Sequence, residues 1–229
     1  MKESIRCKAF RACVLLNNFF GGKAAGIAPE GSALDILVAT ILSQNTSDRN
    51  SVPAFHALKK RFPEWEGVLA ASEEEVARTI RPAGLANVKA RRIKRVLAEI
   101  MQENGGLDLS FLRRMPTPMA RDYLLSFEGV GPKTAAVVLN FGFGKPVFPV
   151  DVHVYRVARR LGLVPETVSR EKAQQLMDAL VPGSQKRKCH LNMIALGRTI
   201  CRPRNPKCFE CPLNQCCAYF SKHFWRKKT

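Results

Sequence analysis

The stretch LSFEGVGPKTAAVVLN, residues 125–140, and the stretch FPVDVHVYRV, residues 148–157, decide how this chain is interpreted. A tight turn is expected at Gly129, Val130 and Gly131, because glycine accepts a positive φ without a Cβ clash. The exposed backbone N–H groups of such a turn, together with the positive end of the next helix dipole, bind phosphate without reading base sequence. These three residues are therefore a candidate DNA-binding hairpin.

Lys133 is expected on the first turn of a helix that begins at Pro132. The helix dipole disfavours an ammonium there and should lower the pKa of the amine, and partial burial would act in the same direction. A lysine nucleophile needs a neutral amine to attack carbon and form a Schiff base, so this location suits that chemistry. The alternative is that Lys133 is one more phosphate-binding cation among 37 Lys and Arg residues.

Asp151 is expected to be the N-cap of a helix with Val154, Val157 and Leu161 on its apolar face and Gly162 at its end. A carboxylate that caps a helix has an ordinary structural role. A carboxylate near a nucleotide sugar could also stabilise positive charge at C1′ and help to move protons, which glycosidic cleavage requires. Both roles stay open for Asp151.

At these residues the chain resembles the endonuclease III family of helix-hairpin-helix DNA glycosylases, over about residues 34–217. That family has a GVGxKTA string with its catalytic lysine and a VDxH string whose aspartate follows eighteen residues later, and Lys133 and Asp151 match these two positions. The resemblance implies a bifunctional DNA glycosylase and AP lyase that excises oxidised pyrimidines from duplex DNA. His153 follows the pattern too, with a local hydrogen bond as its expected role.

Four of the eight cysteines are spaced as C-x6-C-x2-C-x5-C: Cys201, Cys208, Cys211 and Cys217. Spacing alone allows zinc or an iron-sulfur cluster, since each takes four cysteines. Zinc ribbons usually pair two C-x2-C knuckles, and the single knuckle here favours iron. The resemblance implies a 4Fe-4S cluster with Cys217, not its neighbour Cys216, as the fourth ligand.

The other cysteines, Cys7, Cys13 and Cys189, have apolar neighbours and are predicted to be buried structural thiols. A disulfide framework is not expected, because 229 residues can bury a core and no signal peptide opens the chain. These observations predict a reducing compartment, the cytoplasm or nucleoid.

The charge balance indicates a polyanionic partner. The 37 Lys and Arg against 19 Asp and Glu give a formal charge of +18. Charge alone also fits ribosomal, RNA-binding and membrane-surface proteins, but no apolar run approaches the roughly twenty residues that a membrane helix needs. With the resemblance, we expect a monomer that binds double-stranded DNA carrying a damaged base or an abasic site.

An all-α fold is predicted, because apolar residues recur at helical spacing in residues 33–44, 55–62, 71–80, 88–104 and 169–181. The resemblance implies two helical domains. A six-helix barrel, residues 26–145, would carry the hairpin. A discontinuous domain, residues 1–25 and 146–220, would carry the iron-sulfur cluster, and residues 221–229 would form a basic aromatic tail.

Base excision requires the target nucleotide to leave the stack and something to fill the gap. In the family an S-x-Q-x-x-D string supplies a polar plug. Here the string SQNTSD places Asn45 at the plug position and Gln44 one residue earlier, and either could reach into the gap. Leu85 in GLANVKA matches the family's wedge, with a core leucine as the alternative. Glu128 replaces the usual proline before the hairpin, and we expect it to point away or to contact a neighbouring arginine.

Two other functions are considered. Monofunctional mismatch and adenine glycosylases share the implied fold, but these groups lack the hairpin lysine, so Lys133 argues against them. A noncatalytic, structure-specific DNA-binding protein with an iron-sulfur staple would need no nucleophile. Covalent trapping by borohydride on DNA with an abasic site separates these functions from the lyase.

Overall fold

The computed structural model describes residues 3–24 and 28–224, and every regular element in these ranges is helical. The prediction of an all-α fold is therefore confirmed. Contacts between Cα atoms divide the chain into two compact units. The hairpin unit is Pro29–Lys145, and the cysteine unit combines Met1–Ala28 with Pro146–Thr229.

The predicted division into domains, residues 26–145 against 1–25 with 146–220, stays a prediction. The start of the predicted barrel, residue 26, lies outside the described residues, as do residues 225–229 of the predicted tail. Residues before them in that tail belong to a helix, α12 (Ala218–His223).

The hairpin unit contains α2 (Ala33–Leu42), α3 (Asp48–Arg61), α4 (Trp65–Ala70), α5 (Glu73–Thr79), α6 (Ala86–Asn104), α7 (Thr117–Ser126) and α8 (Pro132–Val137). Two short helical turns, η2 (Arg81–Ala83) and η3 (Ser110–Arg113), lie between them, and the π-helical segment η4 (Val138–Gly142) follows α8 directly.

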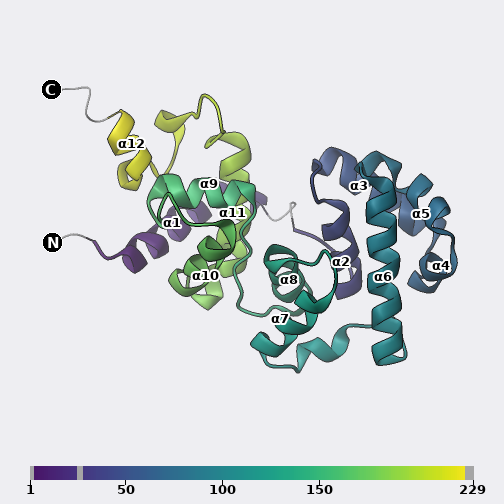
Figure 1. Cartoon of the computed structure of the whole chain (residues 1–229). Helices are drawn as coiled ribbons and strands as arrows, with labels where there is room; N and C mark the ends of the chain where they lie inside the picture. The colour runs from purple at the N-terminus through teal and green to yellow at the C-terminus, as the bar shows by residue number, and fades with distance from the viewer. Residues whose placement is uncertain (1–2, 25–27, 225–229) are drawn as a thin grey trace. The chain divides into compact units, whose positions relative to one another are not determined.

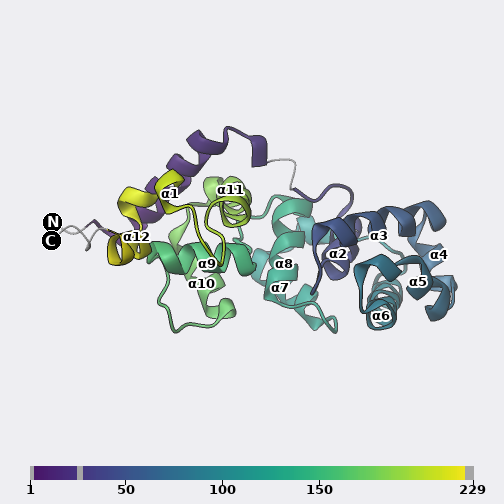
Figure 2. The same cartoon turned by 90° about the horizontal axis from the view of Figure 1, so that it is seen from above.

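Helix α2 is the centre of the hairpin unit. Its sequence, ALDILVATIL, is apolar on nearly every side, and a helix of this kind must be surrounded by protein. It contacts α3, α6, α8 and η4, and Figures 1 and 2 both show it between α8 and α6. The loop that follows Leu42 therefore starts from the middle of this unit.

The next helix, α3, starts earlier than the predicted segment 55–62. It begins at Asp48 and includes Pro53, which has no N–H to donate to the helix. Burial of Ser51, Ala54 and Leu58 on one face holds the helix together across this lost hydrogen bond. Tertiary packing thus overrides the local helix-breaking effect of the proline.

The cysteine unit contains α1 (Ile5–Phe20), α9 (Val152–Leu161), α10 (Arg170–Leu180), α11 (Lys186–Thr199) and α12, with the turns η5 (Gly183–Gln185), η6 (Cys208–Glu210) and η7 (Asn214–Cys216). Helix α11 contacts both α1 and α9, so the purple N-terminal helix packs among the green and yellow C-terminal helices in Figures 1 and 2. At the crossing of α9 and α11, a Cβ on Gly197 would lie 2.8 Å from the Cβ of His153.

The prediction that Cys13 and Cys189 are free thiols is wrong. Both are buried, but they form a disulfide between α1 and α11, with Cα atoms 5.1 Å apart. The packing of α1 against α11 brings the two together across 176 residues of sequence. Cys7 is exposed, not buried. The cysteines therefore no longer support the argument for a reducing compartment.

Among the described helices, none combines the length and the apolar character needed to cross a membrane.

Candidate functional site

The predicted hairpin lies between the end of α7 and the start of α8. Gly129 has φ 82°, and a Cβ there would overlap the side chain of Arg92, so only glycine fits. Val130 donates its N–H to the carbonyl of Phe127 at 3.0 Å, and its own side chain is buried. The hairpin is thus anchored by an apolar residue at its centre.

Gly131 does not use the conformational freedom that was predicted for it. Its φ is −91°, a value open to any residue. A Cβ at this position would meet nothing within 4 Å. The absence of a side chain leaves the backbone beside α8 open to close approach, which is the property that phosphate binding requires.

Lys133 is the second residue of α8 and is half-buried. The first backbone hydrogen bond of this helix runs from Ala135 N to Gly131 O, at 3.0 Å. The lysine therefore lies in the first turn of α8, next to the hairpin glycine Gly131 that caps the helix. The structure thus places an amine and a potential phosphate-binding turn side by side.

The expectation for Glu128 is confirmed. Its carboxylate forms an ion pair with the guanidinium of Arg95 on α6, and both side chains are more than half exposed. The charge that could repel phosphate is therefore paired within the protein.

Gln44 and Asn45 occupy different environments in the plug loop, residues 43–48. The Gln44 amide donates to the carbonyl of Gly129 at 3.0 Å and accepts from Arg92 at 2.7 Å. Asn45 is exposed and has φ 55°, the left-handed conformation that asparagine tolerates better than most residues. Of the two candidates, Asn45 is therefore the one with its side chain available to a ligand.

Leu85 is not a core leucine. It is 60% exposed and has φ 49° at the N-cap of α6, directly after Gly84. A large apolar side chain held on the surface in the left-handed region has no folding role that burial would explain. Gly84 and Leu85 together are called the wedge turn below.

Asp151 caps α9 as predicted. Its Oδ1 atom accepts from the N–H groups of His153 at 2.9 Å and Val154 at 2.8 Å, so Oδ2 lies outside the cap. The helix ends at Gly162, with φ 77°, also as predicted. Asp151 belongs to the cysteine unit and Lys133 to the hairpin unit, and their catalytic roles stay predictions.

His153 has a local role. Its Nδ1 lies 3.1 Å from the guanidinium of Arg156, one turn along α9. Burial lowers the pKa of this histidine, and the Arg156 charge acts in the same direction against the opposing effect of Asp151. The prediction of a local hydrogen bond is confirmed.

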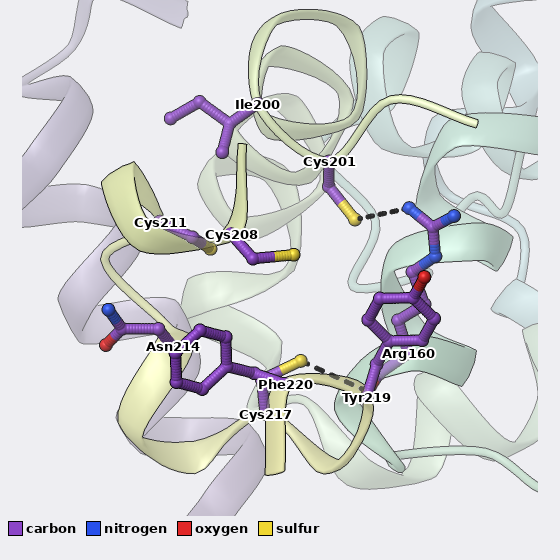
Figure 3. A pocket seen from close by; sticks show the side chains of 9 residues that line it. All are labelled: Arg160, Ile200, Cys201, Cys208, Cys211, Asn214, Cys217, Tyr219 and Phe220. Carbon is purple, nitrogen blue, oxygen red and sulfur yellow. Dashed lines mark hydrogen bonds between the residues drawn. The ribbon is translucent and has the colours of Figure 1, made fainter. Parts of the chain in front are cut away.

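The four predicted metal-binding cysteines line a single pocket that is partly open to solvent. Figure 3 shows the four thiols turned toward its centre, with Arg160 on one side. Arg160 donates to Cys201 Sγ at 3.4 Å, and its backbone carbonyl lies 3.2 Å from Cys217 Sγ. Burial, with help from the neighbouring thiols, raises the pKa of Cys211 to about 12 and also raises those of Cys208 and Cys217.

Cys216 faces elsewhere. Its Sγ lies 3.4 Å from the Leu213 carbonyl, and the charges that act on it come from Arg11, Lys8 and Glu3 around α1. Within residues 3–24 and 28–224, no three His, Cys, Asp or Glu side chains are grouped as a single metal ion would need.

Sequence reasoning did not single out Lys89, Arg92 or Arg160, three cations with interior contacts. One signal existed for Lys89. It stands four residues before Ile93 and thus on the buried stripe that continues to Val96 and Ile100. Arg92 and Arg160 carry no comparable sequence signal.

Comparison with known proteins gives consistent results. Residues 38–182 match the family model described as HhH-GPD superfamily base excision DNA repair protein. Endonuclease III of Thermotoga maritima is 33% identical over 187 residues, which cover 82% of this chain and 83% of that protein. A relative from Arabidopsis thaliana is 42% identical over 157 residues, and there the alignment spans only 54% of the relative's length.

Solved structures agree. A non-covalent endonuclease III–DNA complex has a TM-score of 0.80 at 28% identity, covering 95% of this chain and 96% of that chain. A trapped covalent intermediate of endonuclease III with DNA has a TM-score of 0.79 at 28% identity, covering 93% and 95%. A thermostable thymine-DNA glycosylase has a TM-score of 0.73 at 28% identity, covering 83% and 85%.

Proposed function

The chain belongs to the endonuclease III family of the HhH-GPD superfamily, and we propose that it is a bifunctional DNA glycosylase and AP lyase. Its substrates would be oxidised pyrimidines in duplex DNA, as the resemblance implies. The observation that carries the lyase assignment is Lys133, half-buried on the first turn of α8 directly after the hairpin glycines.

In the proposed reaction, Lys133 Nζ attacks C1′ of the damaged nucleotide while the C1′–N bond breaks and the base leaves with the bonding electrons. Opening of the sugar ring turns the new C1′–N bond into a Schiff base. Loss of a C2′ proton and breakage of the C3′–O bond complete β-elimination and nick the strand 3′ to the lesion. Asp151 would stabilise positive charge at C1′ and help to move protons.

Borohydride trapping tests this function. The wild-type protein, mixed with a duplex that contains one abasic site, should form a covalent adduct that survives a denaturing gel. A panel of duplexes, with an oxidised pyrimidine, a G·T mismatch or no lesion, then defines the base that is excised. Excision without trapping would indicate a monofunctional glycosylase, which the similarity to a thymine-DNA glycosylase makes the second candidate. If the protein shows neither trapping nor excision, it is a noncatalytic DNA-binding protein.

We further propose that Asn45 fills the gap left by the extruded nucleotide and that Leu85 wedges the opposite strand. The exposure of both residues supports this assignment. The internal hydrogen bonds of Gln44 to Gly129 and Arg92 argue against Gln44 as the gap-filling residue.

Asn45→Gly should lower single-turnover excision from a paired lesion by up to about tenfold, because a polar contact worth roughly 1 kcal/mol is lost. Glycine is the right substitution, since φ 55° costs it nothing and the melting temperature should not change. Asn205→Gly is the matched control, an exposed asparagine with φ 47° far along the chain. Equal rates for Asn45→Gly and wild type would remove Asn45 from the role.

We propose that Cys201, Cys208, Cys211 and Cys217 hold a 4Fe-4S cluster. Four thiols around one pocket are the donor set that such a cluster takes. A single zinc ion would instead draw four sulfurs to about 2.3 Å from one point. When bound, the cluster would supply iron–thiolate bonds that join η6, η7 and the end of α11.

The purified protein should be brown and hold about four irons per chain. Cys208→Ser and Cys211→Ser should bleach it and lower its solubility, because the segment around η6 and η7 buries little apolar surface of its own. Cys216→Ser is the matched control and should stay brown. A colourless, active protein with one zinc would overturn the cluster. Bleaching by Cys216→Ser, with Cys217→Ser harmless, would move the fourth ligand by one residue.

The proposed partner is duplex DNA with a damaged base or an abasic site, bound by a monomer. The formal charge of +18 supports strong attraction to the phosphate backbone. Because its substrate is DNA, we place the protein in the cytoplasm or nucleoid.

A further inference from the structure

Lys89 is a buried cation in the first turns of α6. Only 2% of its surface is exposed. Its aliphatic stem lies on the stripe of α6 that also buries Ile93 and Val96. A lysine at such a position is unusual, because burying an ammonium costs free energy unless polar groups surround it.

Two backbone carbonyls surround the Lys89 ammonium. Nζ donates to Leu42 O at 2.7 Å and to Ala83 O at 2.8 Å. Leu42 is the last residue of α2, and Ala83 is the last residue of η2. Carbonyls at helix ends lack intrahelical partners and carry the negative end of the helix dipole, so one cation stabilises both ends.

These two carbonyls stand at the starting points of the two loops proposed to enter DNA. The plug loop begins directly after Leu42, and the wedge turn directly after Ala83. We propose that Lys89 is a positioning residue, which holds the plug loop and the wedge turn at one fixed separation so that Asn45 and Leu85 insert together. This inference rests on the proposed function.

A contribution to stability alone explains Lys89 poorly. Both acceptors are neutral carbonyls, so their hydrogen bonds offset only part of the free energy that burying the ammonium costs. Burial and the nearby Arg92 charge lower the pKa of Lys89, which shows the cost of keeping the charged form there. An apolar residue of similar length, such as methionine, would fill the space but would leave the carbonyls of Leu42 and Ala83 without this donor.

Arg92, one turn further along α6, extends the same arrangement. Its guanidinium holds Gln44 in the plug loop, and its stem lies against Gly129 in the hairpin. The wedge turn thus directly precedes α6. From this helix, Lys89 contacts the start of the plug loop, and Arg92 contacts both the plug loop and the hairpin. Three loops proposed to contact DNA share one rigid support.

Lys89→Met tests the proposal, with Lys94→Met as the matched control. Lys94 lies on the same helix and also donates to helix-end carbonyls, Leu69 O at 2.6 Å and Ala71 O, but α4 leads to no loop proposed to touch DNA. Lys94 is less buried than Lys89, so Lys94→Met should lose no more thermal stability than Lys89→Met. Lys89→Gln, which keeps a neutral donor, is the second variant if Lys89→Met fails to fold.

The first measurement is single-turnover excision from two duplexes. One is fully paired, and the other lacks the nucleotide opposite the lesion, so that the target is already unpaired and costs less to extrude. Lys89→Met should lower the rate on the paired duplex by about tenfold or more and the rate on the gapped duplex by less than about threefold. Lys94→Met should leave both rates near wild type. An equal loss on both duplexes, or no loss on either, would overturn the positioning role.

The second measurement needs no chemistry. 2-Aminopurine opposite a stable abasic analogue brightens when a protein wedge unstacks it, and Lys89→Met should lose most of this increase at saturating protein. A full increase in Lys89→Met would also overturn the proposal. If wild type fails borohydride trapping, the proposed function fails, whereas this fluorescence comparison still decides the role of Lys89.

Discussion

Lys133→Ala should abolish borohydride trapping on DNA with an abasic site and should abolish strand nicking. Without the amine no Schiff base can form, so the residual rate should be indistinguishable from that of uncatalysed DNA. Binding to a stable abasic analogue should weaken only a few-fold, because phosphate contacts are spread over many cations. Trapping yield, nicking rate and dissociation constant, each against wild type, check this result.

Two controls separate chemistry from folding. Lys133→Gln keeps a polar side chain at the second position of α8, and it should be as inactive as the alanine variant. Lys94→Met removes a lysine of the same unit from helix-end carbonyls and should retain trapping. Trapping that survives in Lys133→Ala would show that another amine is the nucleophile.

Asp151→Asn should lower single-turnover base excision by on the order of a hundredfold or more at an unchanged melting temperature. Asparagine is as good an N-cap as aspartate, so its side-chain oxygen can still accept from His153 N and Val154 N. What the substitution removes is the charge, including Oδ2, which lies outside the cap. Excision kinetics and thermal melting, measured on the same preparation, give the two quantities.

The structural role has its own control. Ser169→Ala removes the hydroxyl that accepts from Lys172 N at the start of α10, a cap in the same unit. This variant should lose about 1 kcal/mol of stability and keep its excision rate. Near-wild-type excision by Asp151→Asn would mean that Asp151 is a helix cap and no more.

Much of this molecule follows from local sequence. Asp151 and Ser169 begin helices, because their side chains accept hydrogen bonds from the first backbone N–H groups. Gly105 and Gly162 end helices, because glycine adopts the left-handed conformation without a Cβ clash. The hairpin was also predictable, since a glycine between two helical patterns has few other uses. Capping and turn conformation depend on groups only a few residues apart, so sequence reasoning reaches them.

The limits of prediction appear where distant segments meet. Gly131 was assigned a positive φ that it does not have, because turn preference alone cannot say which of two glycines the fold will use. Pro53 disfavours a helix by local preference, but burial of one face carries α3 across it. In both cases packing against other elements outweighs the local preference.

The all-α class, the family motifs and the candidate nucleophile were predictable without coordinates, because they depend on periodicity and on short strings. Three contacts became known only from the packed helices: Gln44 with Gly129, Lys89 with Leu42 O, and the two cysteines that pair across 176 residues. The first two contacts join residues 85 and 47 positions apart. Such contacts form only when the helices pack. A local sequence pattern does not specify which buried cation or thiol will contact which partner.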